Sequence, residues 1–183
     1  MKEPAWQWEK VDGDSFIPQD LPFAGTEGLK VHVCGDGGPA EFFDLYVTAD
    51  MIEMFVRETN RYADQYIAET GDNMKEHSYA RQWHPTDPNE MRTFLGILFL
   101  MGVLYKPRLP MYWSSDEVYS TPIFGQVMTR DRFLALLKFM HFVDNADPNH
   151  DAHDPNRDKL HKVRPLIEMI RDRCKRVYSL AET

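Results

Sequence analysis

Residues Phe94 to Tyr105 read FLGILFLMGVLY, and this uncharged stretch decides the fold of the chain. It follows a helix-start signal, because Asp87 can cap a helix, Pro88 suits its first position and Glu90 stands at the capping-box position. A helix with apolar residues on nearly every side is typically buried among other helices. The sequence therefore predicts a central core helix that begins at Pro88 and ends before Pro107.

The same stretch is too short to cross a membrane. It has 12 residues, whereas a membrane-spanning helix needs about 18 or more. Its two glycines, Gly96 and Gly102, each lower helix stability by up to about 1 kcal/mol relative to alanine. Their presence is consistent with a second helix that approaches closely, and no membrane association is expected.

Helical periodicity continues on both sides of this segment. Thr48 and Gly71 are a start and a stop signal around an amphipathic helix of residues 51–70, and Thr129 caps another predicted helix over residues 130–142. A brief helix is expected at 121–128, and a last one at 158–178, kinked or restarted at Pro165. Without strand-like alternation in this region, the fold class is all-α, a bundle of four or five helices.

The last predicted helix carries an apolar stripe that should be buried. Its members recur three or four residues apart, and Cys174 is expected to fill a small space in the core. The predicted stripe is Leu160, Val163, Leu166, Ile167, Ile170, Cys174 and Val177.

Residues 1–40 differ in composition from the rest. They contain six glycines and four prolines, which oppose compact packing, so a disordered or weakly ordered leader is predicted, apart from a possible strand at 29–34. Its aromatic residues could dock on the domain or on a partner. The predicted domains are the leader 1–40, an incomplete helical domain 41–178 and a tail 179–183. The aromatic residues of the leader are Trp6, Trp8, Phe16 and Phe23.

The charge of the whole chain argues against nucleic-acid binding, but its distribution does not. Lys plus Arg number 21 and Asp plus Glu 29, a net charge of −8, whereas nucleic-acid-binding domains are usually basic. Residues 157–178 nevertheless hold eight basic and three acidic residues, or +5. These basic residues either stabilise the helix dipole and pair with acidic neighbours, or they contact phosphates. The candidate DNA contacts are Arg171, Arg173, Lys175, Arg176 and Arg164, with Arg57 and Arg61 as weaker ones.

The sequence shows no arrangement of residues typical of a catalytic site. A nucleophile elbow, a P-loop, a dinucleotide-binding turn and a zinc-protease motif are all missing, and Cys34 and Cys174 are 140 positions apart, which suits neither a disulfide framework nor a metal site. Histidines and aspartates at 141–161 are candidate metal ligands, but they are also typical of a solvated acidic loop. No metal and no cofactor are predicted. These candidate ligands are His141, His150, Asp151, His153, Asp154, Asp158 and His161.

Several segments, in this order, resemble the piggyBac transposase family, including its domesticated transposable-element-derived members. They are ETNRYA (58–63), FLGILFLMGV (94–103), YWS (112–114), MTRDRFLALLKFMHFVDN (128–145) and DKLHKVRPL (158–166). The resemblance covers residues 41–178 and implies the N-terminal part of that family's helical dimerisation and DNA-binding domain.

The resemblance also sets an expectation for function. In that family the RNase H-like catalytic domain begins just after the position equivalent to Tyr178, and no residue here matches its catalytic aspartates or its zinc ligands. It implies a non-catalytic module that binds transposon-end-like DNA through the basic C-terminal helix, forms a homodimer or joins further domains, and acts in the nucleus, or otherwise in the cytoplasm. The alternative is a protein-interaction or remnant fold without DNA binding, with core surface left exposed.

Overall fold

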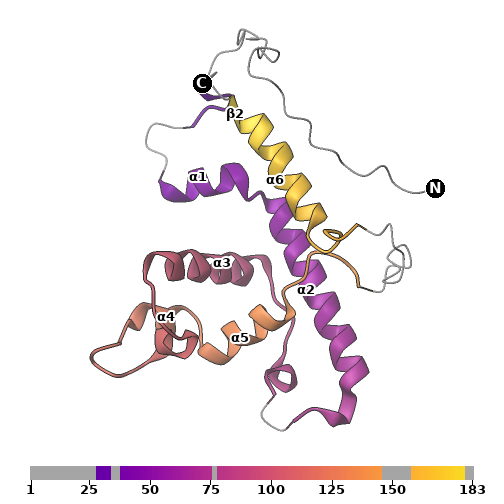
Figure 1. Ribbon diagram of the computed structural model, residues 1–183, viewed down its shortest axis with the longest axis vertical. Helices are drawn as coiled ribbons and strands as arrows, with labels where there is room; N and C mark the ends of the chain where they lie inside the picture. The colour runs from indigo at the N-terminus through magenta and orange to yellow at the C-terminus, as the bar shows by residue number, and fades with distance from the viewer. Residues whose placement is uncertain (1–27, 34–37, 76–77, 146–157, 180–183) are drawn as a thin grey trace, which may run out of the picture.

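The computed structural model describes residues 28–33, 38–75, 78–145 and 158–179, and these are mostly helical (Figure 1). Two short strands pair near the two ends of this region. The elements are β1 (Gly28–Leu29), α1 (Pro39–Tyr46), α2 (Ala49–Thr70), η1 (Gly71–Asn73), η2 (Tyr79–Gln82), α3 (Pro88–Val103), η3 (Leu109–Trp113), α4 (Pro122–Val127), α5 (Arg130–Phe139), α6 (Arg164–Val177) and β2 (Tyr178–Ser179).

The long helix α2 organises the molecule. Thr48 caps it by accepting a hydrogen bond from the Met51 backbone N–H, and Gly71, with a φ of +47°, ends it. Helices α3 and α5 pack against α2, while α1 packs against α6 (Figure 1). The predicted start and stop of this helix are confirmed, because both signals depend only on local backbone geometry.

One main core joins α2, α3, α4 and α5. Fully buried aromatic side chains from three of these helices meet in it, and Phe94 of α3 lies 5.1 Å from Phe133 of α5 between ring centroids. The sulfur-containing and aliphatic side chains of α2 close it from the other side. The buried members are Met51, Ile52, Met54, Phe55, Met91, Phe94, Ile97, Tyr112, Phe124, Met128, Phe133 and Leu136.

Helix α3 is not surrounded as the sequence analysis predicted. Its inner face is buried, but Phe99 is 62% exposed and Val103 is 80% exposed. Nothing lies within 4 Å of a Cβ placed at Gly96 or Gly102, so the close helix approach expected there does not occur among the described residues. The prediction of a core helix enclosed on all sides is wrong for this part of the chain, because periodicity alone cannot tell how many neighbours a helix has.

A two-residue antiparallel ladder joins the segment before α1 to the end of α6. Gly28 pairs with Ser179 and Leu29 with Tyr178, and the Lys30 backbone N–H donates to the Val177 carbonyl oxygen at 2.8 Å. One strand of this ladder, β1, lies inside the predicted leader and overlaps the possible strand at 29–34 at Leu29. Residues 1–27 lie outside the described residues, and the proposed division at residue 40 stays a prediction.

Helix α1 was not foreseen as a separate element. Pro39 stands in its first turn, where proline is common. This proline is the sequence signal that marks the start of the helix. Among the described residues, no helix is both long and apolar enough to cross a membrane.

Removing the cap of α3 should weaken the fold measurably. The Asp87 carboxylate accepts hydrogen bonds from the Asn89 and Glu90 backbone N–H groups at 2.8 and 3.0 Å. Asp87→Ala should lower the free energy of unfolding by about 1 kcal/mol, whereas Asp87→Ser keeps a capping oxygen and should cost much less. Urea unfolding followed by circular dichroism measures both, and equal losses in the two variants would contradict the capping role.

Candidate nucleic-acid interface

Helix α6 carries most of the predicted contact residues. It holds five basic residues and two acidic ones over Arg164–Val177. Pro165 occupies its first turn, so the proline starts the helix where the sequence analysis allowed a kink or a restart. Lys175 and Arg176 lie in the last turn, where the negative end of the helix dipole stabilises positive charges.

The basic side chains of α6 form two rows. Arg164, Arg171 and Lys175 recur seven and four residues apart on one side, whereas Arg173 and Arg176 lie three residues apart on another. The second row lines a cavity of about 220 Å³ between α6 and the N-terminal turn of α2. The cavity is lined by Thr48, Asp50, Met51, Met169, Asp172, Arg173 and Arg176.

Two of these cations are available for a ligand. Arg173 donates to the Leu45 carbonyl oxygen at 2.5 Å, and Arg171 lies 3.5 Å from the Asp172 carboxylate. Lys175 and Arg176 are exposed and have no side-chain hydrogen bond or ion pair within the described ranges. They are therefore the candidates whose charge is least compensated.

Lys30 adds a cation that sequence reasoning missed. Its ammonium group donates to the Lys175 carbonyl oxygen at 3.1 Å, and the β1–β2 ladder holds it beside the C-terminal end of α6. No sequence signal links two residues 145 positions apart, because only the tertiary pairing brings them together.

Arg164 is engaged in a local ion pair. Its guanidinium contacts the Asp158 carboxylate through two hydrogen bonds. The hydrogen bond from Arg164, with a further one from the Leu160 backbone N–H, holds the pKa of Asp158 well below its ordinary range. The same pair raises the pKa of Arg164. Arg164 thus closes the turn before α6, which reduces its availability for phosphate.

The weaker candidates Arg57 and Arg61 lie on α2. Both donate to the Glu58 carboxylate at 2.8 Å, and Arg61 also lies 3.4 Å from Asp144. Glu58 is only 5% exposed, and a buried carboxylate needs such partners. These two arginines compensate Glu58, and the structure does not bring them together with the basic rows of α6.

The apolar side of α6 is less buried than predicted. Val177 is buried, and Leu166 packs on the main core. Ile167 and Ile170 are 42% and 40% exposed, however, and Cys174 is exposed rather than core filling. Leu160 is 50% exposed as well, so only Val163, Leu166 and Val177 of the seven predicted members are covered among the described residues.

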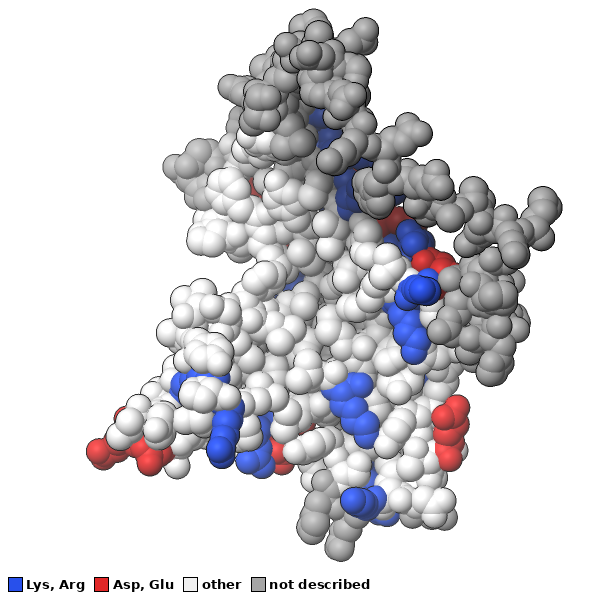
Figure 2. All heavy atoms as spheres, viewed as in Figure 1, with Lys and Arg blue, Asp and Glu red and all other residues white. Residues whose placement is uncertain are grey.

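Figure 2 shows how the charges are spread over one face of the molecule. Blue Lys and Arg side chains follow the α6 side, with red Asp and Glu side chains between them. This mixture agrees with the acidic side chains of Asp50 and Asp172 at the cavity. The basic side chains form rows and not a continuous basic patch. A bound polyanion must therefore contact individual basic side chains.

The candidate metal ligands do not form a metal centre among the described residues. Asp158 pairs with Arg164, and positions 150–154 lie outside the described residues. The His141 ring stacks on Tyr62 with centroids 3.5 Å apart, and burial lowers the pKa of His141. Within the described residues, no group of three or more His, Cys, Asp or Glu residues is placed to hold a metal ion.

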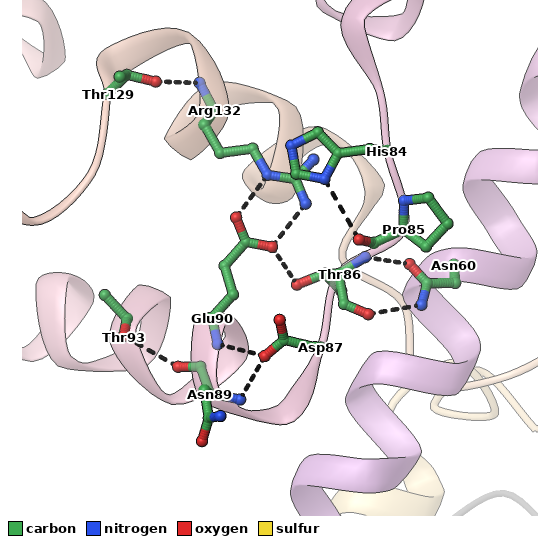
Figure 3. A network of polar contacts seen from close by, with 10 residues as sticks. All are labelled: Asn60, His84, Pro85, Thr86, Asp87, Asn89, Glu90, Thr93, Thr129 and Arg132. Carbon is green, nitrogen blue, oxygen red and sulfur yellow. Dashed lines mark hydrogen bonds and ion pairs between the residues drawn. The ribbon is translucent and has the colours of Figure 1, made fainter.

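A second polar cluster joins α3 to α5 (Figure 3). The Arg132 guanidinium donates to both Glu90 carboxylate oxygens, at 2.7 and 2.6 Å, and the Thr86 hydroxyl donates to Glu90 at 2.7 Å. Asn60 of α2 exchanges two hydrogen bonds with the Thr86 backbone. Arg132 also lies over the Trp83 ring, 4.6 Å from its centroid.

This cluster corrects one detail of the predicted helix start. Glu90 does not return to the backbone of Asp87 as a capping-box partner, because its carboxylate binds Arg132 and Thr86 instead. Burial tends to raise the pKa of Glu90, but the hydrogen bonds from Arg132 and Thr86 outweigh it and leave the pKa below its ordinary value. The cluster connects α2, α3 and α5. Both carboxylate oxygens of Glu90 are already hydrogen-bonded.

The comparisons with known proteins agree with this fold. The family model described as Transposase IS4 matches residues 38–183. The human PiggyBac transposable element-derived protein 3 (Homo sapiens) is 31% identical over 136 residues, which cover 74% of this chain and 20% of that protein. The human PiggyBac transposable element-derived protein 2 is 32% identical over 136 residues, which cover 74% and 19%. The chain thus spans about a fifth of the length of these curated relatives.

A solved structure shares the fold. The cryo-electron-microscopy structure of a piggyBac transposase synaptic complex with hairpin DNA superposes with a TM-score of 0.60 at 21% identity, covering 86% of this chain and 30% of that one. The family match extends over most of the chain, and the relatives and the shared fold agree with it. The chain belongs to the piggyBac-type transposase family.

Proposed function

We propose that this chain is a non-catalytic DNA-binding module that contacts the phosphate backbone through α6. The observation that carries the proposal is the pair Lys175 and Arg176, which are exposed and without an ion pair among the described residues. Arg173 and Lys30 lie beside them. Cations of this kind bind DNA by neutralising phosphates and releasing counterions.

The site geometry sets the expected mode of binding. Arg173 and Arg176 share a cavity of about 220 Å³ with the capped start of α2, where backbone N–H groups favour an anion. Asp50 and Asp172 line the same cavity and oppose the binding of a polyanion. We expect weak, salt-sensitive binding that depends little on sequence, because phosphate contacts carry no direct sequence information.

The related structure supports a nucleic-acid partner. It is a transposase in complex with hairpin DNA, and the region that resembles this chain belongs to a protein of that kind. We extend the proposal to a nuclear location and to self-association, neither of which depends on the identity of the contact residues. Transposon-end-like DNA is the first partner to examine.

Fluorescence anisotropy with a labelled duplex tests the contact residues. Lys175→Gln together with Arg176→Gln should weaken binding about tenfold at low salt, and should lower the slope of log affinity against log salt by about 2, since about one counterion is released per phosphate contact. Arg108→Gln together with Arg130→Gln is the matched control, because it also removes two exposed positive charges, but outside α6.

Two outcomes would overturn the assignment. Equal losses in the α6 variant and in the control would show that net charge alone governs binding. A full loss in Arg57→Gln, where the wild-type arginine is tied to Glu58, would move the contact to α2. A duplex of transposon-end sequence and a scrambled duplex, titrated in parallel, separate sequence readout from backbone contact.

A protein-interaction role has an observation of its own. The outer face of α3 exposes Phe99 and Val103, and Tyr105 follows with 84% exposure. Exposed apolar side chains that gather into a patch mark protein contacts. Light scattering over a range of concentrations decides this alternative: a monomer at every concentration argues against self-association through this face, and growth with concentration supports it.

A further inference from the structure

Helix α6 leaves a continuous apolar stripe open to solvent. Ile167, Ile170 and Cys174 recur three or four residues apart and therefore share one side of the helix, and Tyr178 follows in β2 directly after the helix ends. Each of them is exposed among the described residues. Leu29, which pairs with Tyr178 in the ladder, is 49% exposed and continues the stripe onto β1.

A row of cations borders this stripe. Arg164, Arg171 and Lys175 follow Ile167 and Cys174 around the helix surface. Two copies of α6 packed antiparallel along the stripe would place basic row against basic row, which is unfavourable. The surface instead fits a segment that combines aromatic side chains with negative charge.

We propose that residues 1–27 of this chain dock on the exposed side of α6. This segment holds six acidic and two basic residues and includes Trp6, Trp8, Phe16 and Phe23. Its charge complements the row of Arg164, Arg171 and Lys175, and its aromatic side chains match the apolar stripe. The occupant is therefore a part of the same polypeptide.

The tether makes this docking feasible. The β1–β2 ladder and the hydrogen bond from Lys30 to Lys175 hold residue 28 at the C-terminal end of α6, so the proposed occupant is joined to the described chain close to the stripe. Gly28 has a φ of +113°, a conformation that glycine adopts readily. A helix of 14 residues is about 21 Å long, whereas 27 residues reach as far as about 90 Å.

Docking has a consequence for the proposed DNA contacts. The segment would cover Arg171 and Lys175, two of the α6 cations, and would leave Arg173 and Arg176 on the other row uncovered. If α6 binds DNA, residues 1–27 compete with the DNA for part of the α6 surface. The thiol of Cys174, in the middle of the stripe, reports on docking without any DNA.

The rate of Cys174 alkylation by a maleimide tests the docking in the full chain. Cys34→Ser leaves Cys174 as the single thiol. In this background, Asp12→Asn, Asp14→Asn and Asp20→Asn together should speed alkylation about fivefold, if the segment is docked about four-fifths of the time. Raising the salt to about 1 M should have a similar effect, because the Debye length falls to about 3 Å.

A matched variant removes three acidic charges elsewhere. Glu53→Gln, Asp64→Asn and Glu117→Gln change exposed positions and should leave the alkylation rate unchanged. Carbodiimide cross-linking followed by mass spectrometry should join Lys175 to a carboxylate within residues 1–27. Circular dichroism confirms that each variant is folded.

Three results would overturn the docking. Alkylation at the same rate in the parent and in the leader variant would show that the stripe is uncovered. Protection that increases with protein concentration would assign the stripe to a second copy. Equal acceleration in the matched variant would reduce the effect to net charge. Because none of these readouts uses DNA, failure of the docking and failure of DNA binding are distinguishable.

Discussion

Replacing Arg132 with methionine should lower the free energy of unfolding by about 3 kcal/mol at neutral pH. The substitution leaves the Glu90 carboxylate, whose side chain is 22% exposed, without its bidentate partner, and unpaired charges at such sites are costly. It also removes the guanidinium from the face of Trp83. Urea unfolding at neutral pH measures the loss.

The double variant tests whether the loss comes from the unpaired charge of Glu90. Arg132→Met together with Glu90→Gln should be more stable than Arg132→Met alone, because no charge is then left unpaired. If the loss of stability in the double variant, relative to wild type, equals the sum of the losses in the two single variants, the ion pair contributes nothing. Arg130→Met, on the exposed start of the same helix, is the control and should change stability little.

The pH dependence of the same loss has a defined sign. Hydrogen bonds hold the pKa of Glu90 below its ordinary value of 4.5, so the folded state favours the carboxylate. The stabilisation is fully present above pH 4.5 and is lost as the pH falls through the lower folded-state value. The difference in stability between wild type and Glu90→Gln should therefore shrink at acidic pH, and a difference that grows there would contradict the assignment.

Phe94→Ala should be the most damaging single change in α3, with a loss of about 4 kcal/mol. The Phe94 side chain is fully buried and packs on Phe133, so truncation leaves a cavity. Phe99→Ala, one turn further along the same helix, should cost about 1 kcal/mol, because Phe99 is 62% exposed and only an edge contact with Phe43 is lost. Thermal and urea unfolding compare the two.

The paired substitutions also reveal whether the outer face of α3 is covered in solution. Equal losses for Phe94→Ala and Phe99→Ala would mean that another protein surface buries Phe99. A loss from Phe99→Ala that depends on protein concentration would identify that surface as a second copy. Both variants conserve charge, so electrostatic effects do not interfere.

The starts of the helices could be predicted from sequence because their signals are local. Thr48, Asp87 and Thr129 each accept a backbone hydrogen bond within three residues, so the side chain and the groups that it caps are adjacent in the chain. The mostly helical fold followed from the same periodicity. The residues 41–178 that resemble piggyBac transposases fall within the matched range 38–183.

Burial and charge pairing were harder to predict because they depend on distant neighbours. Cys174 and Phe99 have the right spacing for a core position, yet both are exposed among the described residues. Glu90 has the spacing of a capping box, but Arg132, 42 positions away, binds it more strongly. Arg61 offered a usable signal, because Glu58 stands three residues before it on the same helix.

The same limit applies to the proposed DNA contacts. The net charge of the whole chain is −8 and gives no indication of a basic helix. The count of charged residues within 157–178 does indicate one. That count cannot separate Lys175 and Arg176, which lack an ion pair in the described part of the chain, from Arg164, which is paired with Asp158. Only the tertiary structure distinguishes them.

The salt dependence of DNA binding by the wild-type chain tests the central claim most directly. Anisotropy of a labelled duplex, measured from low to moderate salt, should show log affinity falling linearly with log salt at a slope of about −2 to −4, as expected for two to four phosphate contacts. The contacts would be Lys30, Arg173, Lys175 and Arg176. No binding at the lowest salt, or an affinity that does not change with salt, would contradict a phosphate-binding α6.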